Sequence, residues 1–216
     1  MRHSIKDYVG VVAATLPIRG PIYELGAYQV AGQEGFADLR PLFAGIPYVG
    51  CDARPGPGVD RVTDVHDLDL PASSAGAILC CDTLEHVQFP DRAVQEMHRV
   101  LAPGGILVLT SVMNFHIHDH PHDYWRFTPD GLALLLRRFP QRRVDFAGRD
   151  VFPHTVVGVA AKDGELPLDA YVRAIEAWRR RWRYPKGRTL AGVVTESLPP
   201  FLLDLYRRAR RAPSED

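Results

Sequence analysis

Cysteine is scarce in this chain, and its placement argues against a disulfide framework. Only Cys51, Cys80 and Cys81 occur among the 216 residues. The number is odd, and Cys80 and Cys81 end a continuous apolar run, AGAILCC. Disulfide-stabilised secreted domains use even sets of cysteines, so we expect buried, reduced thiols and a cytoplasmic protein.

Long hydrophobic runs and a net charge are also missing. No stretch approaches the ~20 apolar residues that a transmembrane helix needs. The first 20 residues contain Asp7 and lack the apolar core of a signal peptide. The formal net charge is zero, so we expect neither nucleic acid nor a membrane as a partner.

Basic residues are nevertheless concentrated toward the C-terminus. Arginines cluster at 179–181 and 207–208, and Trp178 and Trp182 lie beside the first cluster. A membrane-surface or nucleic-acid-binding helix is one interpretation. We favour a solvated basic face, with the tryptophans packed on the domain or in a homodimer contact through the C-terminal helices.

Apolar runs and helical periodicities alternate along the first 164 residues. We expect strands at 22–26, 48–52, 61–64, 75–81, 106–112, 143–147 and 152–160, and helices at 4–16, 35–43, 91–101 and from 128 onward. This alternation predicts an α/β fold, a doubly wound Rossmann-like sheet that is mostly parallel and ends in an antiparallel hairpin. We assign residues 1–164 to this domain. Residues 165–216 form a helical extension, with helices at 171–182 and 201–210, that packs on the domain or covers its site.

A glycine-containing turn follows the first strand, where a doubly wound sheet binds nucleotide-like ligands. The turn reads ELGAYQV at 24–30 and lacks the G-x-G-x-x-G spacing of dinucleotide-binding folds. Glycine allows close backbone approach to a ligand, whereas Tyr28 and Gln29 bring side chains to that place. The turn alone therefore does not identify a ligand.

Acidic residues end successive strands of the predicted sheet. Glu24, Asp52, Asp64 and Asp82 stand at or next to the ends of the first four strands. The carboxyl ends of parallel strands line one crevice, so these acids should meet there. Asp52 lies one strand–helix–strand step after Glu24, a position from which a carboxylate can accept both hydroxyl hydrogens of a ribose.

Three segments give the sequence a specific resemblance. They read CDTLEHV at 81–87, EMHRVLAPGG at 96–105 and HDYWRFTP at 122–129. They resemble the motifs of class I S-adenosylmethionine-dependent methyltransferases of the small type 11 group, in which the second motif is usually E-x-x-R-V-L-K-P-G-G. The resemblance covers about residues 22–160 and departs at Ala102 and in the first turn.

This resemblance implies S-adenosylmethionine as the cofactor, S-adenosylhomocysteine as its product, and roles for individual residues. Glu24 would lie near the methionyl amino group, and Asp52 would hold the ribose hydroxyls. Asp64 and the Val65 amide would face the adenine. The complete set implied to bind the cofactor is Glu24, Gly26, Ala27, Tyr28, Gln29, Asp52, Asp64, Val65, Cys81 and Asp82. His86 and Arg126 are expected to be structural.

Histidines alternate in the segment after the strand at 106–112, at 116, 118, 120 and 122. An extended segment would project them to one side. One interpretation is an acceptor-site base, for which His118 or His120 is best placed. A second is a metal site completed by Asp119 or Asp123, and a third is a loop that forms local hydrogen bonds.

The sequence as a whole favours a methyltransferase that acts on a small molecule at oxygen, nitrogen or carbon. We assign His118, His120 and Tyr124 as catalytic residues and assign no metal ligands. The alternatives are a binding module without catalysis, or a cofactor- or metal-dependent enzyme of another reaction type on the same fold.

Overall fold

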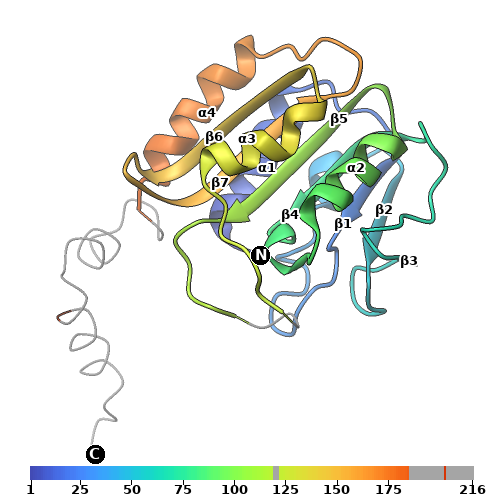
Figure 1. Ribbon diagram of the computed structural model, residues 1–216, viewed down its shortest axis with the longest axis horizontal. Coiled ribbons are helices and arrows are strands. Elements are labelled where there is room, and N and C mark those ends of the chain that lie inside the picture. Colours follow the sequence, from blue (N-terminus) through green and yellow to red (C-terminus); the bar gives the residue numbers. More distant parts are fainter. Residues whose placement is uncertain (119–121, 185–201, 203–216) are drawn as a thin grey trace, which may run out of the picture.

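A computed structural model describes residues 1–118, 122–184 and 202 (Figure 1). Its elements are α1 (His3–Thr15), β1 (Ile22–Leu25), η1 (Arg40–Phe43), β2 (Tyr48–Asp52), β3 (Arg61–Val62), β4 (Ala75–Cys81), η2 (Leu84–His86), α2 (Pro90–Val100), β5 (Leu101–Val112), α3 (Pro129–Leu135), η3 (Leu136–Arg138), β6 (Gln141–Arg149), β7 (Phe152–Ala161) and α4 (Asp169–Arg181).

The strands form one sheet in the order β3-β2-β1-β4-β5-β7-β6. The first five strands of this order run parallel, while β7 pairs antiparallel with β5 and β6 pairs antiparallel with β7. This topology confirms the predicted mostly parallel sheet and its terminal hairpin. The order reverses at β1 and β4, where an open sheet binds its ligand.

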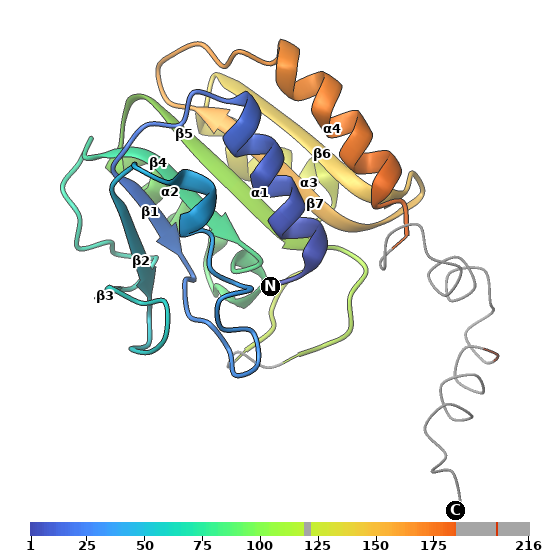
Figure 2. The same ribbon diagram turned by 180° about the vertical axis from the view of Figure 1, so that it is seen from behind.

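Helices cover both faces of the sheet because its central strands are apolar on both sides. In β4, Ile78 and Cys80 belong to the core on one face, and Ala77 and Leu79 to the core on the other. The helices α2 and α3 cover the first face (Figure 1), and α1 and α4 cover the second (Figure 2). The continuous apolar run at 75–81 is thus a central strand buried on both sides.

Helix α4 packs against α1. The hydroxyls of Tyr8 and Tyr171 are 3.2 Å apart, and the Trp178 indole donates a hydrogen bond to the Ser4 carbonyl. Trp182 donates to Asp7. The tryptophan side of α4 is therefore buried within the chain and does not provide the proposed dimer contact. The predicted helix at 201–210 falls almost wholly outside the described residues, and the division of the chain at residue 165 stays a prediction.

The helix predicted at 35–43 is wrong, since only the short η1 forms there. Gly32 and Gly35 adopt positive φ angles of 80° and 73°, which break the helical path. Lys6 of α1 then donates hydrogen bonds to the carbonyls of Phe36 and Asp38. A side chain from a distant element thus replaces the intrahelical partners of these carbonyls.

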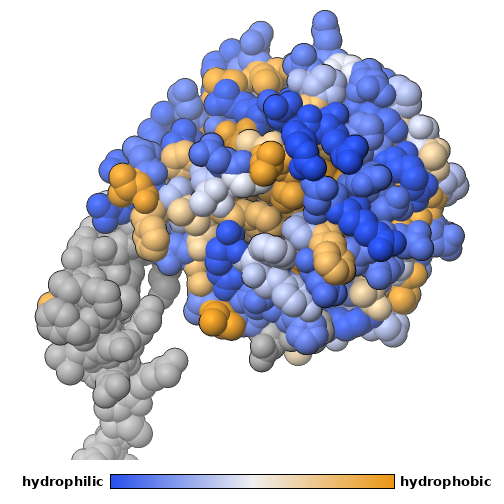
Figure 3. Space-filling view, viewed as in Figure 1, coloured by the Kyte–Doolittle hydropathy of each residue, from blue (hydrophilic) through white to orange (hydrophobic). Residues whose placement is uncertain are grey.

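The surface seen from the side of α2 and α3 is largely hydrophilic, with hydrophobic side chains in small groups (Figure 3). Among the described residues, no helix has the length and apolar character required to cross a lipid bilayer. All three cysteines are buried and unpaired, as predicted. Burial raises the pKa of the Cys51 thiol to about 11, which keeps it protonated at neutral pH.

Candidate active site

The carboxyl ends of the parallel strands open into a pocket of about 840 Å³. The register explains why the ends meet, because Leu25 of β1 pairs with Cys51 of β2 on one side and with Cys80 of β4 on the other. The predicted residues that line this pocket are Glu24, Gly26, Ala27, Tyr28, Asp52, Asp64, Val65, Cys81, Asp82, His118 and Tyr124. Gln29 is not among the lining residues, and His120 lies outside the described part of the chain.

Gly26 forms the turn after β1. Its φ angle is +86°, and a β-carbon at this position would lie 2.1 Å from the Thr83 hydroxyl oxygen. Its amide donates to the Cys51 carbonyl at 2.8 Å. Only glycine satisfies both the left-handed backbone and the contact with Thr83, so this residue fixes the path of the chain across the pocket floor.

Glu24 is a buried acid at the pocket wall, with 4% of its surface exposed. The Tyr48 hydroxyl donates to its Oε2 at 2.8 Å. Burial raises the pKa of Glu24 to about 7, although the hydrogen bond from Tyr48 opposes the shift. A cationic group in the pocket would favour the ionised form, because an opposite charge nearby lowers the pKa of an acid.

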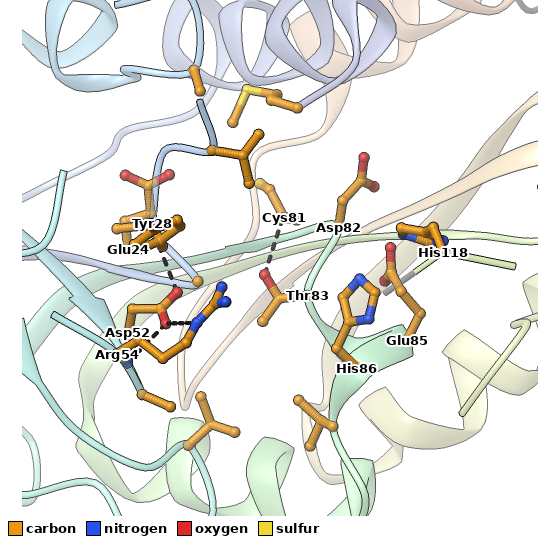
Figure 4. A pocket seen from close by; sticks show the side chains of 18 of the residues that line it. Glu24, Tyr28, Asp52, Arg54, Cys81, Asp82, Thr83, Glu85, His86 and His118 are labelled. Carbon is orange, nitrogen blue, oxygen red and sulfur yellow. Dashed lines mark hydrogen bonds and ion pairs between the residues drawn. The ribbon is translucent and has the colours of Figure 1, made fainter. Parts of the chain in front are cut away.

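Asp52 ends β2 and is held by the neighbouring backbone. Its Oδ2 accepts from the Tyr28 amide at 3.3 Å, and its Oδ1 accepts from the Arg54 amide at 3.0 Å. The Arg54 guanidinium lies 4.5 Å from the centre of the Tyr28 ring and 3.7 Å from Asp52 Oδ1. Tyr28 and Arg54 therefore contact the carboxylate at one end of the pocket (Figure 4).

Asp64 follows β3 and is largely exposed. Its Oδ1 accepts hydrogen bonds from the amide and the ring Nδ1 of His66, at 2.8 and 2.7 Å. The bond from the His66 amide is the main cause of a lowered pKa at Asp64. Val65 lines the pocket beside it, so this edge offers an apolar side chain next to a carboxylate.

Asp82 follows β4 and pairs with Arg2 at the start of α1. The Arg2 Nε and Nη2 donate to the two oxygens of Asp82 at 2.9 and 2.8 Å. The Thr110 hydroxyl donates to the same carboxylate at 3.1 Å. Burial works to raise the pKa of Asp82, but the Arg2 guanidinium holds it below the usual range. The sequence offered no local signal for this contact between residues 80 positions apart.

His118 approaches the pocket from the segment after β5. Its backbone amide donates to Asp123 Oδ2 at 2.9 Å, and its ring Nδ1 is 3.1 Å from the same oxygen. Arg126 forms a two-pronged pair with Asp123, and its hydrogen bonds hold the pKa of that acid far below the usual range. Arg126 thus fixes the segment that carries His118.

Two further residues line the pocket: His86, which was expected to be structural, and Glu85, to which the sequence analysis gave no role. Glu85 is fully buried, and its Oε2 accepts from the Ser111 hydroxyl at 2.7 Å. The rings of His86 and His118 are 4.7 Å apart in an edge-on arrangement. Figure 4 shows Asp82, Glu85, His86 and His118 at one end of the pocket, and Glu24, Tyr28, Asp52 and Arg54 at the other. In the sequence, the only signal that these two residues line the pocket is that an acid and a histidine stand next to each other shortly after β4.

Part of the sequence that forms this pocket is similar to a known protein family. Residues 49–109 match a family model described as a methyltransferase domain. This match runs from β2 to β5 and contains the lining residues Asp52, Asp64, Asp82 and Glu85. This match covers less than a third of the chain, which in that part is similar to a methyltransferase domain. No curated protein matches the sequence.

Solved methyltransferase structures share this fold. An S-adenosylmethionine-dependent methyltransferase of Thermotoga maritima, described as a possible histamine N-methyltransferase, has 20% identity and a TM-score of 0.55, covering 72% of this chain and 89% of that one. The 1,6-didemethyltoxoflavin-N1-methyltransferase of Burkholderia thailandensis, solved with its substrate and S-adenosylhomocysteine, has 20% identity and a TM-score of 0.55, covering 76% and 80%. A putative methyltransferase of Haloferax volcanii, in complex with the Trm112 activator, has 16% identity and a TM-score of 0.56, covering 76% and 91%.

The chemistry of the pocket suits a cofactor that carries a sulfonium, an amino group and ribose hydroxyls. Its donor set fits because the acids Glu24, Asp52, Asp64 and Asp82 attract cations and accept hydrogen bonds. The Arg2 guanidinium in the same wall suits a carboxylate. Gly26 keeps the floor free of a side chain, as close approach of a ligand to the backbone requires.

Proposed function

We propose that the protein transfers a methyl group from S-adenosylmethionine to a small-molecule acceptor in the cytoplasm. The observation that carries this proposal is the continuity of the pocket, which joins the strand-end acids to the Glu85, His86 and His118 end without a dividing wall. A cofactor at the first end and an acceptor at the second would share one cavity. When bound, the cofactor supplies an electrophilic methyl group on a sulfonium.

The strand-end residues would hold the cofactor. In this proposal Glu24 attracts the amino group, Asp52 accepts the ribose hydroxyl hydrogens, and Asp64 with Val65 binds the adenine. The amide hydrogen bonds to Asp52 fix its carboxylate in one orientation. Arg54 and Tyr28 would shift from the carboxylate as the ribose takes their place.

The other end of the pocket would bind the acceptor. Positioning two reactants in line supplies up to ~7–11 kcal/mol toward such reactions, so orientation is the main task of these residues. His118 can take the proton of an acceptor hydroxyl or amine in a site without a metal ion, because Asp123 beside its Nδ1 stabilises the resulting charge. Phe115 and Tyr124 line the same end and help to exclude water.

Calorimetry with S-adenosylhomocysteine tests the proposal. The wild-type protein should bind one molecule per chain. Asp52→Ala removes hydrogen bonds made to a charged group, each worth about 1.5–3 kcal/mol, so affinity should fall at least roughly 10-fold for each bond lost. Asp69→Ala is the matched control, since Asp69 is an exposed acid near the same sheet edge that does not line the pocket.

Two outcomes would contradict the proposal. If the folded protein binds neither S-adenosylmethionine nor S-adenosylhomocysteine, the assignment of the cofactor is wrong. If Asp52→Ala and Asp69→Ala lose the same affinity for S-adenosylhomocysteine, the assignment of Asp52 to the ribose is wrong. Methyl transfer itself is checked with radiolabelled cofactor against a panel of phenols, amines and carbon acids.

A further inference from the structure

Glu85, His86 and His118 place three potential metal-ligand atoms together at the acceptor end of the pocket. One ligand atom from each side chain lies within 4.8 Å of the others. The three come from two segments, the η2 turn after β4 and the loop after β5, which meet only in the folded chain. A cluster of this composition, two imidazoles and one carboxylate, is a common donor set for divalent transition metals.

The carboxylate of Glu85 is the second, independent observation. Its Oε2 accepts from Ser111, but its Oε1 is buried without a hydrogen-bond partner within the described part of the chain. Buried polar atoms in native proteins are rarely left in this state. Glu85 is fully buried and also lines the pocket, so a ligand that reaches Oε1 would give this atom its missing partner.

Both imidazoles are oriented by oxygen atoms at Nδ1. The His86 Nδ1 is 2.5 Å from the His122 carbonyl oxygen, and the His118 Nδ1 is 3.1 Å from the Asp123 carboxylate. Metal-binding histidines usually have their second nitrogen held by a carbonyl or carboxylate in this manner. We therefore assign coordination to Nε2 of each ring. Asp123 is itself fixed by Arg126, so its position does not depend on the metal.

We propose that Glu85 Oε1, His86 Nε2 and His118 Nε2 bind a divalent first-row transition metal ion such as Zn²⁺ or Fe²⁺. With three protein ligands the ion keeps an open coordination position, as catalytic sites do. That position faces the pocket that all three residues line. Bonds of about 2.1 Å in a tetrahedral site keep ligand atoms about 3.4 Å apart, so the side chains would close by up to about 1.4 Å around the ion.

The role of this metal ion in catalysis rests on the proposed function, methyl transfer to a small molecule. An acceptor hydroxyl bound at the open position would lose its proton more readily, because a metal ion lowers the pKa of a coordinated oxygen. The deprotonated oxygen is then the nucleophile, and the proton passes to solvent. His118 acts as a ligand in this arrangement. The acceptor class is accordingly a phenol, enol or other hydroxyl compound.

Metal binding is measured on full-length protein prepared without a histidine tag and freed of metal by a chelator. Titration with Co²⁺ should give one ion per chain and the visible absorption bands of a four- or five-coordinate site. Zn²⁺ should displace Co²⁺ and abolish the bands. Glu85→Gln and His118→Ala should each weaken Co²⁺ binding at least tenfold, as loss of a direct ligand does.

His116→Ala is the matched control. His116 also lines the pocket and lies two residues from His118, but its ring stacks on Phe115 and is not part of the cluster. This variant should bind Co²⁺ as the wild type does. Circular dichroism and S-adenosylhomocysteine calorimetry confirm that each variant is folded.

Absence of stoichiometric Co²⁺ binding by folded protein would overturn the inference. Equal weakening in His116→Ala and His118→Ala would also overturn it, because the ion would then bind the histidine-rich segment nonspecifically. S-adenosylhomocysteine binding without metal binding refutes the metal site and leaves the proposed function standing. Metal binding without S-adenosylhomocysteine binding supports the metal site and refutes the proposed function.

Discussion

Replacing Arg2 with alanine should destabilise the protein, because Arg2 joins α1 to the end of β4. Its guanidinium donates two hydrogen bonds to Asp82 and a third to the Thr155 hydroxyl. The Arg2 and Asp82 side chains are only 21% and 16% exposed. Arg2→Ala would leave the Asp82 carboxylate in a mostly buried place with the Thr110 hydroxyl as its remaining side-chain partner.

The magnitude follows from this burial. Removing one partner of a fully buried ion pair costs about 3–5 kcal/mol. Some water already reaches the Arg2–Asp82 pair, so we expect a smaller loss in the free energy of unfolding, about 2–3 kcal/mol. For a chain of this size each kcal/mol shifts the melting temperature by about 2–4 °C. The variant should therefore melt roughly 5–10 °C below the wild type.

Urea denaturation followed by circular dichroism gives the free energies, and a double-mutant cycle with Asp82→Asn isolates the pair. The double variant should be more stable than the sum of the two single losses implies, because its second substitution removes the orphaned charge. Arg137→Ala is the control, as its pair with Asp91 lies on the surface, and its unfolding midpoint should not move.

Two results would refute the reasoning about Arg2. One is an Arg2→Ala variant within about 0.5 kcal/mol of the wild type, the usual range for surface changes. The other is strict additivity in the cycle, which would mean that the two side chains do not stabilise one another.

Two further predictions concern Glu24 in the pocket wall and Gly26 in the pocket floor. The native state binds the proton of Glu24 more tightly than the unfolded chain, with a pKa of about 7 against 4.5, so this contribution to stability is complete below pH 4.5 and is lost as the pH rises through 7. As the pH rises between these values, Glu24→Gln should therefore become more stable relative to the wild type, by up to about 3 kcal/mol. If the difference in melting temperature between the variant and the wild type is the same at pH 5 and at pH 8.5, this prediction is wrong. Gly26→Ala should lower the unfolding free energy by about 1–3 kcal/mol because of its positive φ and the contact with Thr83. The double variant Gly26→Ala with Thr83→Ala should recover part of this loss in urea denaturation, and no recovery would show that the contact is not the cause.

The fold was predictable because its signals are local. The run at 75–81 has the length and composition of a strand buried on both faces, and that is what it forms. Thr128 caps α3 through a hydrogen bond from the Gly131 amide, with Pro129 in the first turn, so the helix begins where the sequence predicts. The hairpin of β6 and β7 follows from two β-like runs around a short turn. Each of these features depends on neighbouring residues only.

The failures concern contacts between distant segments. The helix expected at 35–43 was replaced by a loop that Lys6 stabilises. Arg2 was overlooked in the pocket because its partner follows β4, on another element. His86 was expected to be structural and Glu85 was given no role, although both lie beside His118 in the folded chain. Contacts between segments far apart in the chain determine all three, and a single sequence carries no pattern for them.

The η2 turn also has a consequence for how the two ends of the pocket respond to ligands. Asp82 and Glu85 are three residues apart, and the charge of Asp82, added to the larger effect of burial, raises the pKa of Glu85 to about 8. Any ligand that changes the charge near one carboxylate therefore changes affinity at the other. Thermodynamic reciprocity requires the same factor in both directions, so the two ends of the cavity cannot be tuned independently by substitution in this turn.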